Sequence, residues 1–229
     1  MNHQSTLQSK FDISRTLATE IIKLASVSFY EKNTILQPQY TTPSHLFFIL
    51  SGLAGLFKTT DQQKETYCGI ASAGQMTNDL CLILDEPQEP SIRALSEVLV
   101  VELPMDAARI LYKNNDEFPR MINRSLAEKL KIHTTLFNLQ TESSLQKRVC
   151  RALITLNGIT ETNRVPITLT QMAILLNISR NTVTKAIKFI EKQGAIESHY
   201  GLLTIKDEKA LHAIASVPFV KEHPSHPSI

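Results

Sequence analysis

The sequence predicts an α+β protein with three parts: an N-terminal β-barrel of the jelly-roll type, one long helix, and a C-terminal winged helix-turn-helix. Short apolar runs separated by turn residues fill positions 33–103, a pattern typical of barrels and jelly rolls. Positions 116–142 contain no glycine, and their one proline stands where a first helical turn tolerates it. Two short amphipathic helices and a hairpin pattern follow. We place the domains at 1–115, 116–143 and 144–229.

Composition and charge divide the chain into two unlike halves. No apolar run approaches the roughly 20 residues of a membrane span, and the N-terminus lacks the charged and apolar regions of a signal peptide. We therefore expect a cytoplasmic protein with no membrane contact. Residues 1–115 carry 9 Lys/Arg against 12 Asp/Glu (−3), whereas residues 144–212 carry 10 against 5 (+5). Only the second half is expected to meet a polyanion.

The three cysteines lie far apart in the sequence and form no C-x-x-C motif, so they predict no disulfide framework. Cys68, Cys81 and Cys150 are most simply buried free thiols. Cys68 and Cys81 would form a redox sensor only if the fold brought them together.

The N-terminal elements follow from changes in the hydrophobic period. Apolar residues at helical spacing predict one or two helices between Phe11 and Ser28. Short apolar runs bounded by turn residues then predict strands. The predicted strands are Asn33–Leu36, His45–Leu50, Leu53–Lys58, Glu65–Ala71, Ser91–Ala94 and Val98–Leu103. Asp61–Lys64 is predicted as a polar hairpin tip, and Leu80–Leu84 is a short apolar segment.

A long helix is predicted from Asp116 to about Glu142, ended by Ser143 and Ser144. Two apolar stripes run along it, and the first has a spacing close to that of a coiled coil. The first stripe is Leu126, Leu130, His133 and Phe137, and the second is Ile132, Leu136 and Leu139. One stripe can pack on the barrel of the same chain and the other on a partner chain. His133 is interpreted as filler at the edge of an interface; a register-setting or pH-sensitive group is the alternative.

The C-terminal half opens with a predicted helix at Leu145–Leu156. Its outward basic residues are expected to face phosphate: Lys147, Arg148 and Arg151. A polar loop at Asn157–Arg164 and a short strand at Val165–Ile167 follow. Thr168 and Gln171 then form a capping box that starts a short helix. Asn177 suits a left-handed turn, and Ser179 caps the next helix.

The helix after Ser179 has two opposite faces. The apolar face consists of Val183, Ala186, Ile187 and Ile190, and the polar face of Arg180, Asn181, Thr184, Lys185 and Lys188. A basic outer face alone is typical of any solvated helix. The capped helix before it, the hairpin after it and the segregated charge favour a recognition helix that reads DNA.

A hairpin pattern completes the C-terminal domain. Gln193-Gly194 ends the helix. Strands Ala195–Glu197 and Leu202–Ile205, joined by a turn at positions 199–201, form a wing. A final helix is predicted at Asp207–Ile214, and positions 217–229 as a mobile tail.

Several motifs resemble the Crp/Fnr family of transcription regulators. Positions 46–52 (LFFILSG) resemble the family's "lyfIlsG" strand, and positions 178–185 (ISRNTVTK) resemble its "cSRxTVxR" recognition helix. A Gly74-led loop, Asp79-Leu80, Ile92-Arg93-Ala94 and Val101–Pro104 follow in the family's order. The similarity covers roughly residues 28–210. It implies a cyclic-nucleotide-binding-like barrel and a parallel homodimer joined by the long helix, through Leu126, Leu130, His133 and Phe137.

The resemblance also implies where an effector would bind. In relatives that bind cAMP, the glutamate of a G-E-L segment holds the ribose, and the Arg and Ser of an R-S-A segment hold the cyclic phosphate. The matching positions here, which we call the cassette, are Asn78, Asp79 and Leu80, then Gln88, Glu89 and Pro90. Carboxylates raise the cost of burying a phosphate, and Arg93 lies outside the cassette. We therefore expect no control by cAMP or cGMP in the usual mode; a cyclic-nucleotide-responsive regulator with a divergent pocket is the alternative.

The chemistry of the recognition helix predicts its contacts. Arg180 suits guanine O6 and N7, and Asn181, which replaces a common Glu, suits adenine. Lys185 replaces the more usual Arg, so it is expected to contact a phosphate or a single base acceptor. The predicted DNA-binding residues are Arg180, Asn181, Lys185, Thr184, Ser179, Thr182, Thr170, Lys188 and His199. Ser179, Thr182 and Thr170 are expected to bind phosphates through hydroxyl and N–H groups. His199 would meet the backbone from the wing, or simply lie in an exposed turn.

Other functions find little support in the sequence. Residues 1–30 contain no cysteine, which excludes the iron–sulfur cluster that the family's oxygen sensors hold there. A haem would need an axial ligand such as His45 or His133, which are more simply structural. No H-E-x-x-H, G-x-S-x-G, phosphate-binding loop or metal-ligand cluster occurs, so we predict no enzyme, cofactor or metal. The predicted partners are palindromic double-stranded DNA, a second copy of the chain, RNA polymerase and an unidentified effector.

Overall fold

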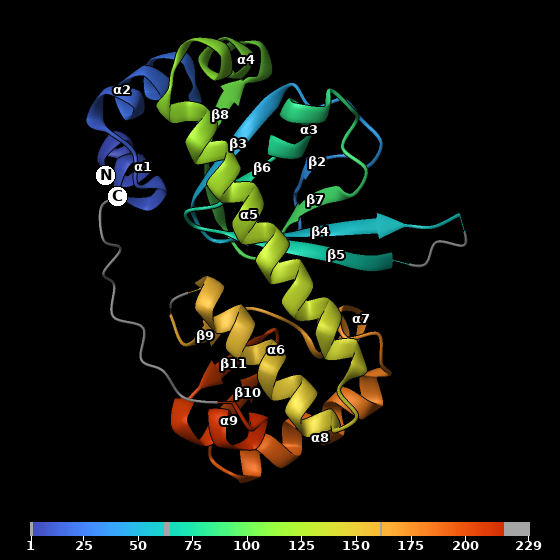
Figure 1. The fold of residues 1–229 in the computed structure, drawn as a ribbon. Coiled ribbons are helices and arrows are strands. Elements are labelled where there is room, and N and C mark those ends of the chain that lie inside the picture. Colours follow the sequence, from blue (N-terminus) through green and yellow to red (C-terminus); the bar gives the residue numbers. More distant parts are fainter. Residues whose placement is uncertain (1, 62–64, 161, 218–229) are drawn as a thin grey trace.

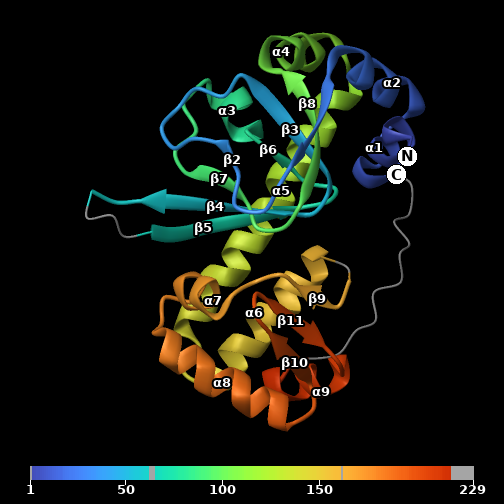
Figure 2. The same ribbon diagram turned by 180° about the vertical axis from the view of Figure 1, so that it is seen from behind.

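The computed structural model describes residues 2–61, 65–160 and 162–217 (Figure 1). A β-rich domain lies at the top, helix α5 runs obliquely down from it, and a helical domain with a small sheet lies below (Figures 1 and 2). The α+β class and the order barrel, long helix, winged helix-turn-helix are therefore confirmed.

Two helices precede the barrel. They are α1 (His3–Phe11) and α2 (Arg15–Leu24), and both pack on the outer face of the barrel. The ring of Phe11 meets that of Phe48 edge-on at 5.2 Å. The prediction of helix up to Ser28 was wrong at both ends. The first helix begins near the N-terminus, and positions 26–28 belong to a strand because they pair with β8.

The barrel consists of two antiparallel four-stranded sheets, with strand orders β1-β8-β3-β6 and β2-β7-β4-β5. The strands are β1 Ser26–Tyr30, β2 Ile35–Gln37, β3 His45–Ser51, β4 Leu53–Thr59, β5 Glu65–Ser72, β6 Met76–Thr77, β7 Ser91–Ala94 and β8 Val98–Pro104. The middle of β3 is a continuous apolar run because both of its faces are covered. Phe47 and Ile49 point into the barrel, while Leu46, Phe48 and Leu50 pack with the helices.

The apolar segment 80–84 lies in a short helix, α3 (Asp79–Leu84). Strand β6 and helix α4 (Met105–Asn114) had no predicted counterpart. The predicted hairpin tip lies largely outside the described residues, because positions 62–64 are not among them.

The long helix is present as α5 (Glu117–Asn138), followed by a 3₁₀ turn, η1 (Leu139–Thr141). The Asn115 side chain accepts from the Glu117 and Phe118 N–H groups, both at 2.9 Å, and so begins the helix. The N-terminal part of α5 buries Phe118 and its neighbours against the barrel. The C-terminal end of α5 buries Leu136 in the core of the lower domain, and Leu139 of η1 is buried there too. One helix thus belongs to both cores.

The lower domain contains, within the described residues, four helices and a three-stranded sheet with the order β10-β11-β9. Its elements are α6 Leu145–Thr160, β9 Arg164–Val165, α7 Leu169–Leu175, α8 Arg180–Lys192, β10 Ile196–His199, β11 Leu202–Ile205 and α9 Glu208–Ala215. Positions 157–160, predicted as loop, continue α6 because Ile159 packs on the core. The predicted tail beyond Val217 lies outside the described residues.

The two domains share one continuous apolar core. Leu53, Phe57, Ile70 and Leu95 of the barrel cluster with the buried residues of the lower domain. The Ser72 hydroxyl also donates to the carbonyl of Ile159 at 2.8 Å. Helix α7 lies against strand β5 as a result. The lower domain, which carries α8, therefore packs directly against the barrel.

Candidate nucleic-acid interface and effector region

Local contacts fix the turn between α7 and α8. The predicted capping box is present: the Thr168 N–H donates to Gln171 Oε1 at 2.8 Å, and the Gln171 N–H donates to Thr168 Oγ1 at 3.1 Å. Asn177 takes the predicted left-handed backbone, with φ 51°. Ser179 accepts from the Thr182 N–H at 3.1 Å and begins α8. Short-range sequence therefore sets how α8 follows α7.

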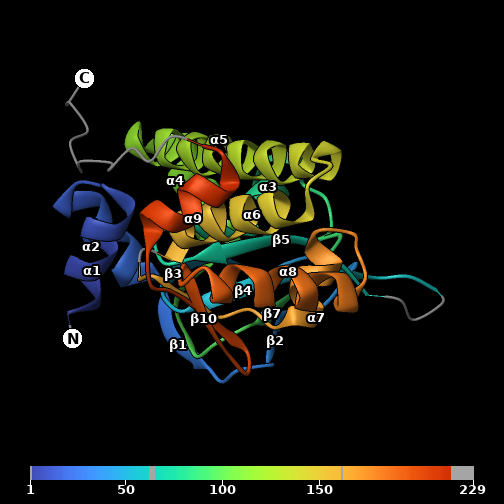
Figure 3. The ribbon, with the colours of Figure 1, turned by 90° about the horizontal axis from the view of Figure 1, so that it is seen from below.

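Helix α8 presents its basic side chains to solvent. Val183, Ala186, Ile187 and Ile190 are buried, while Arg180, Asn181, Lys185 and Lys188 are exposed. Within the described residues, no carboxylate pairs with Arg180, Lys185 or Lys188. The helix lies across the lower end of the molecule beside α7 (Figure 3). Its charge is available to a polyanion that approaches from below.

The hydroxyl groups near the start of α8 are partly occupied. Thr184 Oγ1 donates to the Arg180 carbonyl at 2.9 Å. The Ser179 and Thr182 hydroxyls share one hydrogen bond at 2.8 Å, so one of the two protons remains for another acceptor. Thr170 is exposed on α7. Thr184 keeps only its acceptor capacity for a base or water.

Two arginines of α6 do not face outward as predicted. Arg148 Nη2 donates to the Leu176 carbonyl at 2.7 Å, just before the turn into α8. Arg151 Nε donates to the Ala215 carbonyl at 3.1 Å, and its Nη1 pairs with Glu142 at 2.9 Å. The prediction that both reach phosphate was wrong, because unpaired carbonyls at helix ends require donors. Lys147 lies partly buried on the same helix.

The wing contains an unpredicted charge pattern. His199 Nε2 lies 3.1 Å from Glu197, whose pKa is lowered chiefly by a hydrogen bond from Lys206. Tyr200 at the tip is fully exposed. A first side-chain carbon at Gly201 would lie 3.5 Å from Lys32 Nζ, so the turn lies beside the β1–β2 loop of the barrel. Nothing in the local sequence could have placed Lys32 there.

The carboxylate of Asp79, the cassette residue expected near a ribose, is already bound. It is 2% exposed, and its Oδ2 accepts from the Ser125 hydroxyl at 2.8 Å. Its Oδ1 pairs with Lys129 Nζ. Ser125 and Lys129 lie one turn apart on α5, and burial lowers the pKa of Lys129 despite the partner. In the sequence, Ser125 and Lys129 could have been noticed as two polar residues four positions apart beside an apolar stripe.

The other cassette residues are also turned toward partners in the same chain. Asn78 Nδ2 donates to the His45 carbonyl at 2.8 Å, and Asn78 Oδ1 is buried with no hydrogen-bond partner among the described residues. Gln88 Oε1 accepts from the Cys81 thiol at 2.9 Å. Glu89 faces out and pairs with Lys58.

The nearby cations are already paired, and the cassette helix keeps an apolar outer side. Arg93 pairs with Glu65 at 2.6 Å and lies over the Phe57 ring. Leu80 is 54% exposed on α3. Every positive group that we find near the cassette within the described residues therefore already has a carboxylate partner.

Both domains match known families. Residues 27–115 match the cyclic nucleotide-binding domain, and residues 147–214 match the Crp-like helix-turn-helix domain. The chain belongs to the Crp/Fnr family of transcription regulators. The two matched domains are those of a transcription regulator and not of an enzyme.

Several solved structures share this fold. A CRP-family regulator from Thermus thermophilus has a TM-score of 0.69 at 16% identity, over 82% of this chain and 96% of its own. A c-di-GMP-responsive global regulator from Xanthomonas campestris gives 0.68 at 15%, over 84% and 99%. FixK2 from Bradyrhizobium japonicum gives 0.72 at 12%, over 85% and 99%. No curated protein matched the chain.

The four members of the first apolar stripe of α5 have different surroundings in this Crp/Fnr protein. Leu130 and Phe137 are each 67% exposed. Leu126, by contrast, packs with the barrel core, and the His133 ring lies so close to Gly69 that a methyl group there would be 3.2 Å away. Burial and Lys129 lower the pKa of His133. Leu130 and Phe137 are thus the exposed apolar members of the stripe, Leu126 packs on the barrel, and His133 is exposed but lies beside Gly69.

The three cysteines are free thiols, and His45 has partners within its own strand region. Burial raises the pKa of the Cys81 thiol to about 11 and that of Cys150 to about 12, which keeps both protonated and unreactive at neutral pH. Cys68 is also a free thiol. His45 bonds to Ser44 and stacks on Phe47. No cluster of three metal-ligating side chains occurs among these residues.

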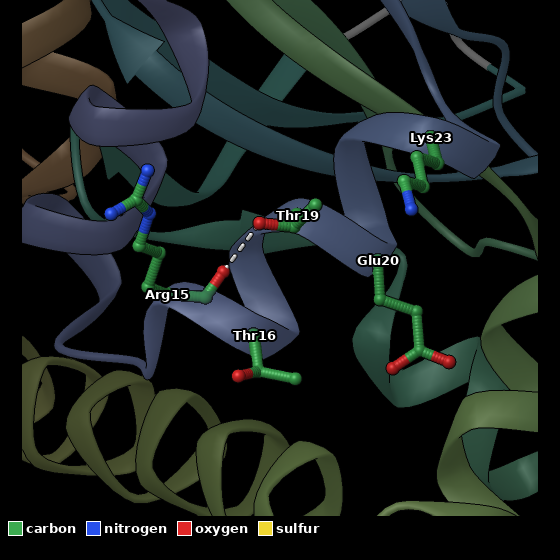
Figure 4. A pocket seen from close by; sticks show the side chains of 5 residues that line it. All are labelled: Arg15, Thr16, Thr19, Glu20 and Lys23. Carbon is green, nitrogen blue, oxygen red and sulfur yellow. Dashed lines mark hydrogen bonds between the residues drawn. The ribbon is translucent and has the colours of Figure 1, made fainter.

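Two clefts lie away from the cassette. One, of about 530 Å³, follows one side of α2 and is lined by Arg15, Thr16, Thr19, Glu20 and Lys23 (Figure 4). The other, of about 380 Å³, lies between the barrel and the lower domain, where Ser72 and Arg164 are among its lining residues. Neither includes a cassette residue. No helix in the described part of the chain is long and apolar enough to span a membrane.

Proposed function

We propose that this Crp/Fnr protein is a homodimer that binds a palindromic DNA operator through α8, and that cAMP does not control it through the cassette. The observation that carries the DNA-binding part is the outward face of α8, where Arg180, Lys185 and Lys188 are exposed and unpaired with carboxylates of the described residues. A capped helix with long donors at its N-terminal end fits the major groove. A regulator of this kind acts in the cytoplasm, where RNA polymerase is the further partner.

The individual contacts follow from side-chain chemistry. Arg180 donates to guanine O6 and N7, and Asn181 pairs with adenine N6 and N7. Lys185 and Lys188 contact phosphates or single base acceptors. The sugar-phosphate backbone is bound by Thr170, Ser179, Thr182, Lys147 and His199. Lys32 adds positive charge beside the wing.

The exposed apolar side chains of α5 support a homodimer. Leu130 and Phe137 are large, and they lie seven residues apart on the same side of one helix. Two such helices packed in parallel would bury both pairs, with the spacing of a coiled coil. A two-fold dimer would present two copies of α8 to half-sites about one helical turn apart.

The bound state of Asp79 supports independence from cAMP. A ribose at this position would have to displace Lys129 or Ser125 from a buried carboxylate. A phosphate would meet Gln88 and Glu89 without a free cation nearby, and an unpaired buried phosphate is costly.

A cyclic-nucleotide-responsive regulator with a divergent pocket is the alternative. It is favoured by the similar fold of the c-di-GMP-responsive regulator from Xanthomonas campestris. Such a ligand would bind outside the cassette, for example across the two domains.

Selection from a randomised DNA pool tests the proposal. The purified full chain is incubated with the pool alone, with cAMP, or with c-di-GMP. Enrichment of a palindrome without ligand is the expected result. Enrichment only with cAMP would contradict the role assigned to Gln88 and Glu89, and enrichment only with c-di-GMP would favour the alternative. Absence of enrichment in all three arms would count against the DNA-binding role.

A further inference from the structure

One ion pair holds the linker between α5 and α6. The turn η1 ends at Thr141 and α6 begins at Leu145, so three residues, 142–144, join the dimerisation helix to the DNA-binding domain. The side chain of Glu142 is only 16% exposed, although carboxylates are ordinarily solvated. Its burial requires partners.

Both oxygens of Glu142 have them. Oε1 accepts from the backbone N–H of Ser144 at 3.1 Å, within the linker itself. Oε2 pairs with Arg151 Nη1 at 2.9 Å. One carboxylate therefore connects the linker backbone to the second turn of α6.

Arg151 extends the connection to the far side of the domain. Its Nε donates to the carbonyl of Ala215, the last residue of α9. Leu136 and Leu139, just before the linker, are buried in the same domain's core. These contacts join the end of α5, the linker, α6 and α9. Within the described residues, the Glu142–Arg151 ion pair is the only charged contact of the linker.

We propose that Glu142, held by Arg151, is a positioning residue that fixes the angle of α8 relative to α5 and so sets the operator spacing that the dimer accepts. This inference rests on the proposed dimer and palindrome. One inserted base pair moves the half-sites apart by about 3.4 Å and rotates them by roughly 34°. A rigid linker cannot follow that change, whereas a loosened linker can.

The test compares operators whose central spacer is lengthened or shortened by one base pair. For the wild-type protein we expect each change to weaken binding by about tenfold or more, a usual size for coupling between sites. For Glu142→Gln and Arg151→Met we expect all three spacers to bind within about threefold of one another. Arg151→Lys keeps a charge for Glu142 and is expected to retain most of the wild-type penalty.

Glu208→Gln is the matched control. Glu208 accepts from Asn157 between α9 and α6 at 3.3 Å and lies outside the linker. The loss of affinity that this variant shows on changing the spacer is therefore expected to equal that of the wild-type protein. A spacer penalty that survives in Glu142→Gln would overturn the inference alone. Glu142→Gln could also weaken binding to all three operators equally and still discriminate between their spacers. That result would overturn the inference too, because it would show a purely structural role for Glu142. A wild-type protein that selects no palindrome would overturn the proposed function together with it.

Discussion

Arg180 is the first side chain of the recognition helix and the one with most hydrogen-bond donors. It is exposed, has no carboxylate partner among the described residues, and stands next to the cap at Ser179. A planar guanidinium can bind both acceptors of one guanine, which a lysine cannot. Base discrimination at one position of each half-site is therefore assigned to it.

Arg180→Ala is expected to weaken binding to the selected operator by about 1–3 kcal/mol and to relax the preference at one base pair. Lys192→Ala, at the other end of α8, serves as the control and should keep that preference. Titration of matched and mismatched operators measures both effects. Equal weakening of specific and random DNA would assign Arg180 to phosphate instead.

Lys129 illustrates a buried charge that depends on its partner. Without it, the buried side chain of Asp79 would keep only two uncharged donors, the Ser125 hydroxyl and the Leu80 N–H. Removing one member of a buried ion pair is more costly than removing both, because the remaining charge is not solvated.

Lys129→Met should lower the free energy of unfolding by about 3 kcal/mol. The double variant Lys129→Met/Asp79→Asn should lower it by clearly less, because no buried charge is left unpaired. Urea denaturation of both variants gives the comparison. The exposed Lys131→Met is the control and should change stability by no more than about 0.5 kcal/mol. If the double variant is as unstable as the single one, the pair is not coupled.

At the scale of elements, the seven-residue helix α7 depends strongly on its first turn. It is too short to be stable alone, so its capping box and its packing on β5 determine whether it forms. The cap sets where α7 begins, and the turn into α8 follows the other end of this helix.

Thr168→Ala should destabilise the protein by about 1 kcal/mol, because the Gln171 N–H would have no acceptor. Thr170→Ala, on the same helix but without a capping bond, should have little effect. Thermal denaturation of the two variants side by side is sufficient. Equal melting temperatures for both would show that tertiary packing alone holds α7.

The exposed face of α5 is the second feature at this scale. Leu130 and Phe137 would be unusual as isolated solvent contacts on a helix whose other large apolar residues are buried or partly buried.

Phe137→Asp should convert the dimer to monomer, since a carboxylate would be buried opposite its own symmetry mate. Sedimentation equilibrium at micromolar concentration measures the change. Lys131→Asp, a solvated position on the same helix, should remain dimeric. A wild-type monomer at these concentrations would contradict the proposed interface.

At the scale of the whole molecule, the charge is distributed unevenly. The N-terminal domain is acidic and the C-terminal domain basic, so electrostatic attraction should orient the protein with α8 toward DNA. The shared core, which includes Leu53 and Phe57 of the barrel, packs the two domains against each other.

Binding to the operator should therefore depend steeply on salt. If each dimer neutralises about six to ten phosphates, affinity should fall by roughly 10³–10⁵ between about 50 and 200 mM salt. Fluorescence anisotropy at several salt concentrations gives the slope. Lys188→Ala should reduce that slope by about one for each phosphate that the protein no longer neutralises. A flat dependence would exclude a phosphate-dominated interface.

Elements whose signals are local could be predicted from the sequence without the fold. The capping box at Thr168, the left-handed Asn177, the cap at Ser179 and the two faces of α8 all depend on residues within a few positions of one another. The strands from His45 to Ala71 and the long helix were likewise predictable from hydrophobic period and turn residues.

The polar groups that meet across long separations could be identified only in the folded chain. Asp79 binds Lys129, Arg151 binds Glu142 and Ala215, and Lys32 lies beside Gly201. These partners are charged or carbonyl groups whose choice depends on burial and on unpaired helix ends rather than on spacing. For the same reason Arg148 and Arg151 were predicted to bind phosphate, although the fold uses them to satisfy its own carbonyls.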